Sequence, residues 1–221
     1  MGKQSHAIPS VLVSIIHRPG ERIEAELVGW LLRQQARSLT GQATFALGDI
    51  LKGKPFDAQR NRQVASFLAT RYERLMFVDA DIVPPGDAID RLLDHDKAIC
   101  GIASQSFQFD EPFAVILEAD PDVPHGYRQA QDLRGLKRLR NGAIGLACCM
   151  IKREVFEKVK PPWFEEILIE GGLKTRDADF VFCEKARAAG YDVWVDCDRL
   201  TDHLVVVGLK RINELAVKRN G

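Results

Sequence analysis

The sequence lacks several features that would assign it to a special class of protein. Its 221 residues contain no Cys-x-x-Cys pair, no excess of charge of either sign and no long hydrophobic run. Without that cysteine spacing, neither a zinc site nor a disulfide framework is expected, and the five cysteines are predicted to be reduced core thiols. Because lysine plus arginine and aspartate plus glutamate both number 31, the net charge does not indicate a nucleic-acid partner.

The distribution of apolar residues indicates a globular protein rather than a membrane protein. No segment approaches the roughly 18 apolar residues that a membrane-spanning helix needs, and residues 1–10 contain no apolar, signal-like stretch. We therefore expect no transmembrane segment and a cytoplasmic location. Hydrophobic residues make up 46% and charged residues 28% of the chain, which is typical of a soluble protein with one full hydrophobic core.

Strand-like and helical segments alternate along most of the chain. Short apolar runs typical of buried strands are separated by segments in which apolar side chains repeat with helical spacing. The strands are predicted at 11–16, 43–47, 75–82, 98–103, 142–151 and 193–195, and the helices at 21–38, 61–72, 86–95, 153–159 and 177–189. Residues 104–141 contain short segments between turns, which we interpret as antiparallel strands and loops. The pattern predicts an α/β domain with a mixed, mostly parallel central sheet flanked by helices.

One of the predicted strands ends in two aspartates, Asp79 and Asp81. Side chains alternate along a strand, so both carboxylates are expected on the same side of its carboxyl end, where ligands bind in open α/β sheets. Neighbouring carboxylates repel each other, and a divalent cation between them and a polyphosphate relieves that repulsion. An acidic turn is the alternative, because Pro84-Pro85-Gly86 follows and short motifs often match by chance.

Further polar residues occur at element ends in a regular order along the chain. Asn61-Arg62 opens a predicted helix, Asp79-Ala80-Asp81 closes a strand, Asp179 lies in the first turn of a helix, and His203 follows the last strand. This order, together with segment 178–183 and the Arg-Ala-Ala-Gly-Tyr after it, resembles the GT-A glycosyltransferases. The resemblance is to the bacterial and phage proteins near glycosyltransferase family 2.

The resemblance covers residues 11–203 and implies a single-domain GT-A fold. It implies a donor-binding half over about 10–104, an acceptor-side half over about 105–203 and a C-terminal helix over about 208–220. The sequence departs from the family pattern in two places. Ala178 stands where such proteins commonly have a glutamate, and Gly142-Ala143-Ile144-Gly145 is one residue wider than the family's Gly-x-Gly segment.

The resemblance also implies a metal site. Asp79, Ala80 and Asp81 would contact a nucleotide-sugar donor, and Asp79, Asp81 and His203 would hold Mn²⁺ or Mg²⁺ against its diphosphate. Such a cation neutralises charge as the nucleoside diphosphate leaves. A histidine ligand favours manganese over magnesium. The alternative for His203 is a surface histidine that binds nothing.

The resemblance assigns Asp179 as the catalytic base, which removes the acceptor's hydroxyl proton as that oxygen attacks the anomeric carbon. The alternative is a carboxylate that only complements the helix dipole. Asn61 and Arg62 would face the nucleotide, although Arg62 also fits a solvated position in a first helical turn. Gly142 would let the backbone approach the donor sugar.

Trp163 and Phe164 follow two prolines and suit an aromatic platform on the acceptor side, because aromatic faces contact the apolar side of a sugar ring. Burial in the core is an equally good interpretation of this pair.

These inferences lead us to expect a metal-dependent, inverting glycosyltransferase that uses a UDP- or GDP-sugar and a carbohydrate or other hydroxyl acceptor. A nucleotidyltransferase is one alternative, but it predicts a glycine-rich loop with a lysine after the first strand. The chain instead has His17-Arg18-Pro19-Gly20-Glu21 there. A catalytically silent module that binds sugar nucleotides or carbohydrates is the other alternative, since a fold by itself does not settle activity.

Overall fold

A mixed sheet forms the centre of the molecule in the computed structural model, which describes residues 10–17, 22–40, 45–48, 51–52, 55–108, 111–122, 127–168, 175–205 and 209. Its strands in this part of the chain are β1 (Val11–His17), β2 (Phe45–Leu47), β3 (Leu51–Lys52), β4 (Arg74–Asp79), β6 (Ile99–Ala103), β11 (Leu136–Leu139), β13 (Cys148–Lys152) and β16 (Val193–Leu200). The order is β11-β16-β6-β13-β4-β1-β2, and β3 also pairs with β1. Strands β11 and β13 are antiparallel to their neighbours, whereas the other pairs are parallel. The predicted mixed, mostly parallel sheet is therefore confirmed.

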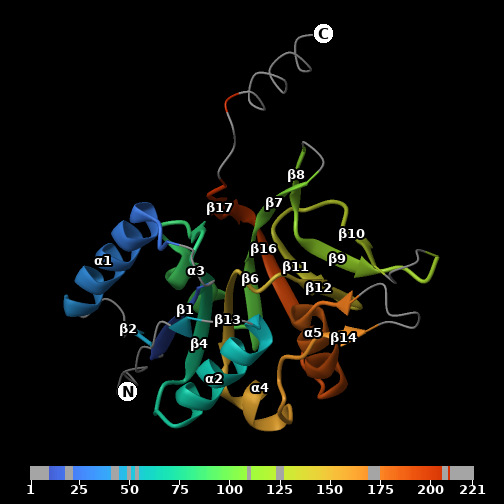
Figure 1. Ribbon diagram of the computed structural model, residues 1–221, viewed down its shortest axis with the longest axis horizontal. Helices are drawn as coiled ribbons and strands as arrows, with labels where there is room; N and C mark the ends of the chain where they lie inside the picture. Colours follow the sequence, from blue (N-terminus) through green and yellow to red (C-terminus); the bar gives the residue numbers. More distant parts are fainter. Residues whose placement is uncertain are drawn as a thin grey trace, which may run out of the picture.

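Helices cover both faces of this sheet (Figure 1). They are α1 (Ala25–Leu39), α2 (Phe56–Leu68), α3 (Ala88–His95), α4 (Arg153–Lys158) and α5 (Ala178–Ala188). Alternate residues of β1 point to opposite faces: Val13 packs in the core that includes Trp30 of α1, and Leu12 in the core that includes Phe67 of α2. Helices α1 and α3 belong to the first core and α2, α4 and α5 to the second. None of the helices in the described ranges is long and apolar enough to cross a bilayer.

Four small antiparallel sheets accompany the central sheet in the described part of the chain. Their strands are β5 (Ile82–Val83) with β17 (Asp202–His203), β7 (Gln105–Gln108) with β8 (Glu111–Ala114), β9 (Ile116–Ala119) with β10 (Tyr127–Gln129) and β12 (Gly142–Ile144), and β14 (Ile167–Leu168) with β15 (Thr175–Arg176). The strands β7 to β10 of these sheets lie within residues 104–141, where the turn-rich pattern predicts antiparallel strands. The single strand predicted over 142–151 is wrong. It is two strands in different sheets, β12 and β13, because the chain leaves the side sheet at Gly145 and enters the central one at Cys148.

The second helix begins five residues earlier than the sequence pattern predicts. Pro55 is the N-cap residue, in an extended conformation, and α2 starts at Phe56 rather than at Asn61. Proline suits a helix start, where its missing N–H leaves no intrahelical bond unmade. Asn61 therefore lies in the middle of α2. The helix predicted over about 208–220 falls outside the described residues except for position 209.

A buried carboxylate ties α3 to β16. Asp196 has no exposed surface and accepts hydrogen bonds from Arg91 Nε at 2.7 Å, Arg91 Nη2 at 3.0 Å, His95 Nε2 at 2.9 Å and the Asp198 backbone N–H at 3.0 Å. Burial would raise the pKa of Asp196, but the bonds from Arg91 and His95 outweigh it and lower the pKa below its ordinary value. Since α3 follows Asp81 in the chain and β16 leads to His203, this junction helps to hold the segments that carry these two residues together.

We expect Asp196→Asn to lower the free energy of unfolding by about 3–5 kcal/mol near pH 7, because Arg91 loses its buried partner. The matched change Asp192→Asn, at an exposed carboxylate paired with Arg138, should cost less than about 1 kcal/mol. A lowered carboxyl pKa contributes stability above the unfolded-state value of about 4, and this contribution is lost as the pH falls through the folded-state value. The two variants and the parent should be compared by urea denaturation at pH 7 and below pH 4. A gap that does not narrow in acid would contradict the assignment.

Candidate functional site

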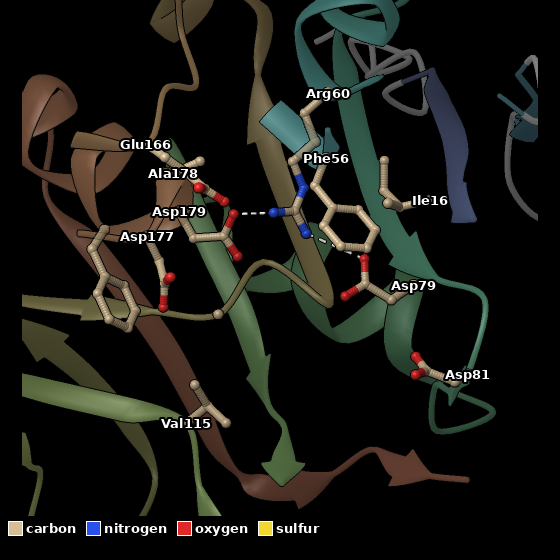
Figure 2. Close-up of a pocket in the computed structure, with 12 residues that line it drawn as sticks. Ile16, Phe56, Arg60, Asp79, Asp81, Val115, Glu166, Asp177, Ala178 and Asp179 are labelled. Carbon is tan, nitrogen blue, oxygen red and sulfur yellow. Dashed lines mark hydrogen bonds and ion pairs between the residues drawn. The ribbon is translucent and has the colours of Figure 1, made fainter. Parts of the chain in front are cut away.

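The described part of the chain contains a cleft at the carboxyl ends of β1 and β4, beside the start of α5 (Figure 2). Its larger lobe has a volume of about 250 Å³ and its smaller lobe about 160 Å³. Both lobes share Asp79, Asp81 and Asp179, so the structure brings together carboxylates that lie about 100 residues apart in sequence. A cleft at this edge is where open α/β sheets bind their ligands.

Arg60 is the residue at the centre of this cleft, and the sequence analysis did not single it out. Its guanidinium donates to Asp179 from Nη1 and to Asp79 from Nη2, the latter at 3.2 Å (Figure 2). Only 6% of Arg60 is exposed, and its carbon Cζ lies 5.7 Å from the ring centre of Phe77 and 5.9 Å from that of Phe164. Burial would lower the pKa of Arg60, but Asp179 and Asp79 raise it above its ordinary value. The guanidinium therefore stays charged and compensates both carboxylates.

Asp179 lies in the first turn of α5, as predicted, and points into the cleft. Oδ1 accepts a hydrogen bond from Arg60, and Oδ2 accepts one from the backbone N–H of Leu146 at 2.9 Å. These bonds fix its orientation toward the centre of the cleft. A carboxylate oxygen has room for more than one donor, so an acceptor hydroxyl could still reach it. Its role as a base remains a prediction.

Asp81 and His203 lie together on the other side of the cleft. Strand β17 pairs with β5, and His203 Nε2 lies 3.3 Å from Asp81 Oδ2. His203 Nδ1 lies 2.7 Å from the carbonyl oxygen of Gln105, an acceptor that leaves Nε2 as the nitrogen facing Asp81. The hydrogen bond with Asp81 raises the pKa of His203 despite its partial burial. The expected pairing of these two residues is therefore present.

Asp79 and Asp81 do not project from one strand as predicted. Strand β4 ends at Asp79, and Ala80 and Asp81 form a turn. Asp79 is directed to Arg60, while Asp81 is directed to His203. Ala80 is 1% exposed and donates its N–H to the carbonyl of Ile16 at 2.8 Å, so its side chain is part of the core rather than of the donor site.

Neither Asn61 nor Arg62 lines the cleft. The Asn61 side chain accepts from the backbone N–H groups of Trp163 and Phe164 at 2.9 and 3.1 Å, and donates to the carbonyl of Phe164 at 2.7 Å. Arg62 is exposed. Because α2 begins at Phe56, the residues of this helix that reach the cleft are Phe56 and Arg60, one helical turn apart. Recognising Pro55 as a helix start would have identified them.

The aromatic pair after the prolines is part of the core. Phe164 has no exposed surface, stacks on Phe182 with ring centres 4.7 Å apart and meets the edge of Phe77. Trp163 donates Nε1–H to the carbonyl of Phe156 at 2.9 Å. Phe164 is therefore a core anchor, whereas Trp163 is partly exposed and packs against the core. Neither residue lines the two lobes of the cleft, so the predicted acceptor platform is not found there.

Gly142 is buried in β12 and does not line the cleft. A Cβ at this position would lie 2.2 Å from the carbonyl oxygen of Leu117 on β9, so glycine is needed for strand pairing. The small residue that lines both lobes is Gly145, three positions later. The glycine of this segment that lines the cleft is therefore Gly145 and not Gly142.

The described residues contain no group of three or more His, Cys, Asp or Glu side chains gathered as a metal cage. The local donor set is Asp81 with His203, an oxygen and a nitrogen ligand 3.3 Å apart, with Asp79 nearby in the same lobe. Mg²⁺ and Mn²⁺ commonly take one or two protein ligands and complete their shell with water and substrate phosphates. The residues present fit such an open site.

No protein-family model and no curated protein matches this chain. Among solved structures, A197 from STIV is 15% identical, with a TM-score of 0.52, covering 90% of this chain and 98% of that one. The inositol-1-phosphate CTP transferase from T. maritima is 13% identical, with a TM-score of 0.50, covering 96% of each chain. At these identities the likeness extends to the fold alone, which is compatible with that of a nucleotidyltransferase.

Arg60 and Asp179 should be energetically coupled. We expect Arg60→Met to lower the free energy of unfolding by about 3–5 kcal/mol, because two carboxylates lose a shared buried cation. Asp179→Asn should cost less in the Arg60→Met background than in the parent, with a coupling of about 0.5–3 kcal/mol. Arg62→Met, on the exposed face of the same helix, should change stability by less than about 0.5 kcal/mol. Additive effects in denaturant titrations would show that the ion pair does not form in solution.

Proposed function

We propose that this protein is an enzyme that transfers a group to or from a nucleotide-type substrate with the help of a divalent cation. The observation that carries the proposal is the cleft in which Asp79, Asp81 and His203 face Asp179 across Arg60. One side offers ligands for a cation and its phosphates, and the other offers a carboxylate for proton transfer. The fold supports the nucleotide part of the proposal only by likeness.

Glycosyl transfer is the reaction that the site residues favour. Asp81 and His203 would hold Mn²⁺ or Mg²⁺, which would supply charge neutralisation at a sugar nucleotide's diphosphate. The acceptor's hydroxyl oxygen would attack the anomeric carbon, its proton would pass to Asp179, and the bond to the nucleoside diphosphate would break. Attack from the side opposite the leaving group inverts that carbon. Arg60 would hold Asp179 in the cleft while the donor is bound.

Nucleotidyl transfer is the second candidate, and the comparison with solved structures supports it better than glycosyl transfer. The inositol-1-phosphate CTP transferase matches nearly the whole chain in fold. In that reaction class a phosphate-bearing acceptor attacks a nucleoside triphosphate and pyrophosphate leaves. The same cation site would serve the triphosphate. Against it stands the absence of a lysine in the sequence His17-Arg18-Pro19-Gly20-Glu21 after the first strand.

The identity of the released product distinguishes the two reactions. The full chain with Mn²⁺ or Mg²⁺ should release UDP or GDP from a sugar nucleotide if it is a glycosyltransferase, and pyrophosphate from CTP with inositol 1-phosphate or a sugar phosphate if it is a nucleotidyltransferase. Binding of nucleotides without either product would identify a binding module. No nucleotide binding in thermal-shift assays would refute the proposal as a whole, because a ligand at 100 times its dissociation constant stabilises by about 2.7 kcal/mol.

Nucleotide binding and product release should both require the divalent cation. Asp81→Ala should abolish the cation dependence together with most of the activity, and His203→Ala should weaken cation affinity about 10-fold or more. Asp202→Ala, at the exposed neighbour of His203, is the matched control and should titrate like the parent. Superimposable cation titrations of the parent and His203→Ala would mean that the histidine is not a ligand.

Asp179→Asn should lower turnover about 10²–10⁴-fold, because it removes a base and keeps the shape of the side chain. Nucleotide affinity should change little, since the cation ligands lie on the other side of the cleft. A carboxylate that only pairs with Arg60 and complements the helix dipole predicts near-normal turnover together with a loss of stability, of which the dipole accounts for about 0.3–1 kcal/mol. Glu26→Gln, in the first turn of α1, provides that comparison. Full activity of Asp179→Asn would exclude it as the base.

A further inference from the structure

One wall of the larger lobe consists of Val115, Glu166, Asp177 and Phe180, and we call this wall the acceptor lobe. Val115 also borders the smaller lobe that contains Asp81 and His203, whereas the other three residues line the larger lobe alone. Val115 lies between β8 and β9, Glu166 directly before β14, and the other two at the start of α5. Asp177 is the N-cap residue of α5, yet its side chain makes no capping hydrogen bond. The capping position therefore does not explain why a carboxylate is turned into this cavity.

The charges of the cleft are unevenly compensated. Arg60 pairs with Asp79 and Asp179, and His203 contacts Asp81. Within the part of the chain that the structure describes, Glu166 and Asp177 have neither a hydrogen bond to their side chains nor an ion pair. Burial raises the pKa of Asp177, and the neighbouring charge of Asp179 raises it further, as expected for a carboxylate without a cation beside it.

The basic side chains near the start of α5 are engaged elsewhere. Arg176 binds Glu184, Lys185 binds Glu165, and Arg187 donates to the carbonyl of Gly142. None of these three lines the larger lobe. A phosphate group in the acceptor lobe would thus meet two carboxylates, both on exposed residues, while the described cation of the larger lobe, Arg60, already pairs with Asp79 and Asp179. Such like-charge contacts are unfavourable.

The same wall suits a different ligand. Unpaired carboxylates accept hydrogen bonds from hydroxyl or ammonium groups. The ring of Phe180 and the methyl groups of Val115 offer an apolar surface beside them, and the C–H face of a sugar ring packs well on such a surface. The combination of an apolar surface with two free acceptors matches a molecule that is apolar on one face and carries hydrogen-bond donors around its edge.

We propose that the acceptor lobe binds a sugar ring without phosphate, either neutral or carrying an amine. This inference rests on the proposed function, because it assigns the group that receives the transferred moiety. It also bears on the choice between the two reactions, since nucleotidyl transfer of the kind described needs a phosphate-bearing acceptor.

Ligand-observed NMR on the full chain with Mg²⁺ and UDP or GDP tests the inference. The probes are two matched pairs: glucose with glucose 6-phosphate, and glucosamine with glucosamine 6-phosphate. Each unphosphorylated sugar should bind at least about 10-fold more tightly than the corresponding sugar phosphate. Equal or tighter binding of the phosphates would overturn the inference, and so would the absence of measurable binding by both unphosphorylated sugars.

Substitutions test whether the residues of the acceptor lobe cause the preference for unphosphorylated sugars. Asp177→Asn combined with Glu166→Gln should reduce the preference to within about 3-fold, because both uncompensated charges are removed. The control is Asp87→Asn combined with Glu157→Gln, which removes the same amount of charge from positions outside the cleft. Asp87, like Asp177, is an N-cap residue whose side chain makes no capping hydrogen bond. This control should leave the preference for unphosphorylated sugars unchanged. An unchanged preference in the first pair of substitutions would overturn the assignment to these residues.

Phe180→Ala should weaken the binding of all four sugars by about 2- to 10-fold without changing the preference for the unphosphorylated ones, because the ring contributes apolar contact and no charge. An unchanged affinity would show that the Phe180 ring does not contact the bound sugar. Nucleotide binding, measured separately by thermal shift with Mg²⁺, keeps the two proposals apart. If nucleotides do not bind, the proposed function fails; if nucleotides bind and the phosphates are not disfavoured, only the acceptor inference fails.

Discussion

The buried guanidinium of Arg60 is the interaction on which the two sides of the cleft depend. Asp79 ends a central strand and Asp179 begins a helix 100 residues later, and their like charges would separate without the cation between them. Phe77 and Phe164 pack beside the guanidinium and only 6% of Arg60 is exposed, so water compensates little of these charges. Burial of this kind is costly unless each charge is paired, which is why the geometry is strongly determined.

A second constraint holds residues 196–204 at the cleft. Asp196, held by Arg91 and His95, attaches β16 to α3 from within the fold. The chain then continues through Thr201, whose N–H donates to the carbonyl of Ala103, into the short strand that carries His203. The backbone N–H of residue 204 also donates to the carbonyl of Asp81, so the histidine is fixed to the turn that it faces.

The resulting site has an acidic character that bears on its chemistry. The carboxylates of the larger lobe outnumber the single guanidinium that the described lining contains. Under the proposed function, a cation beside Asp81 and His203 would offset this charge when a polyphosphate binds. On our inference, the opposite wall, with Asp177 and Glu166, disfavours a second phosphate. The likeness of fold is to a nucleotidyltransferase, whereas this distribution of charge is the observation from which we argue for an acceptor without phosphate.

Elements and their order could be predicted from the sequence, because apolar periodicity reports which face of a strand or helix is buried. The strand that ends at Asp79, the helix that begins near Asp179 and the position of His203 after the last strand of the central sheet follow from such local patterns. Pairings across the fold have no local signal. The orientation of Asp79 toward Arg60 and the burial of Phe164 were decided by the tertiary structure alone. Both depend on which charged groups and aromatic rings come into contact when segments distant in sequence pack together.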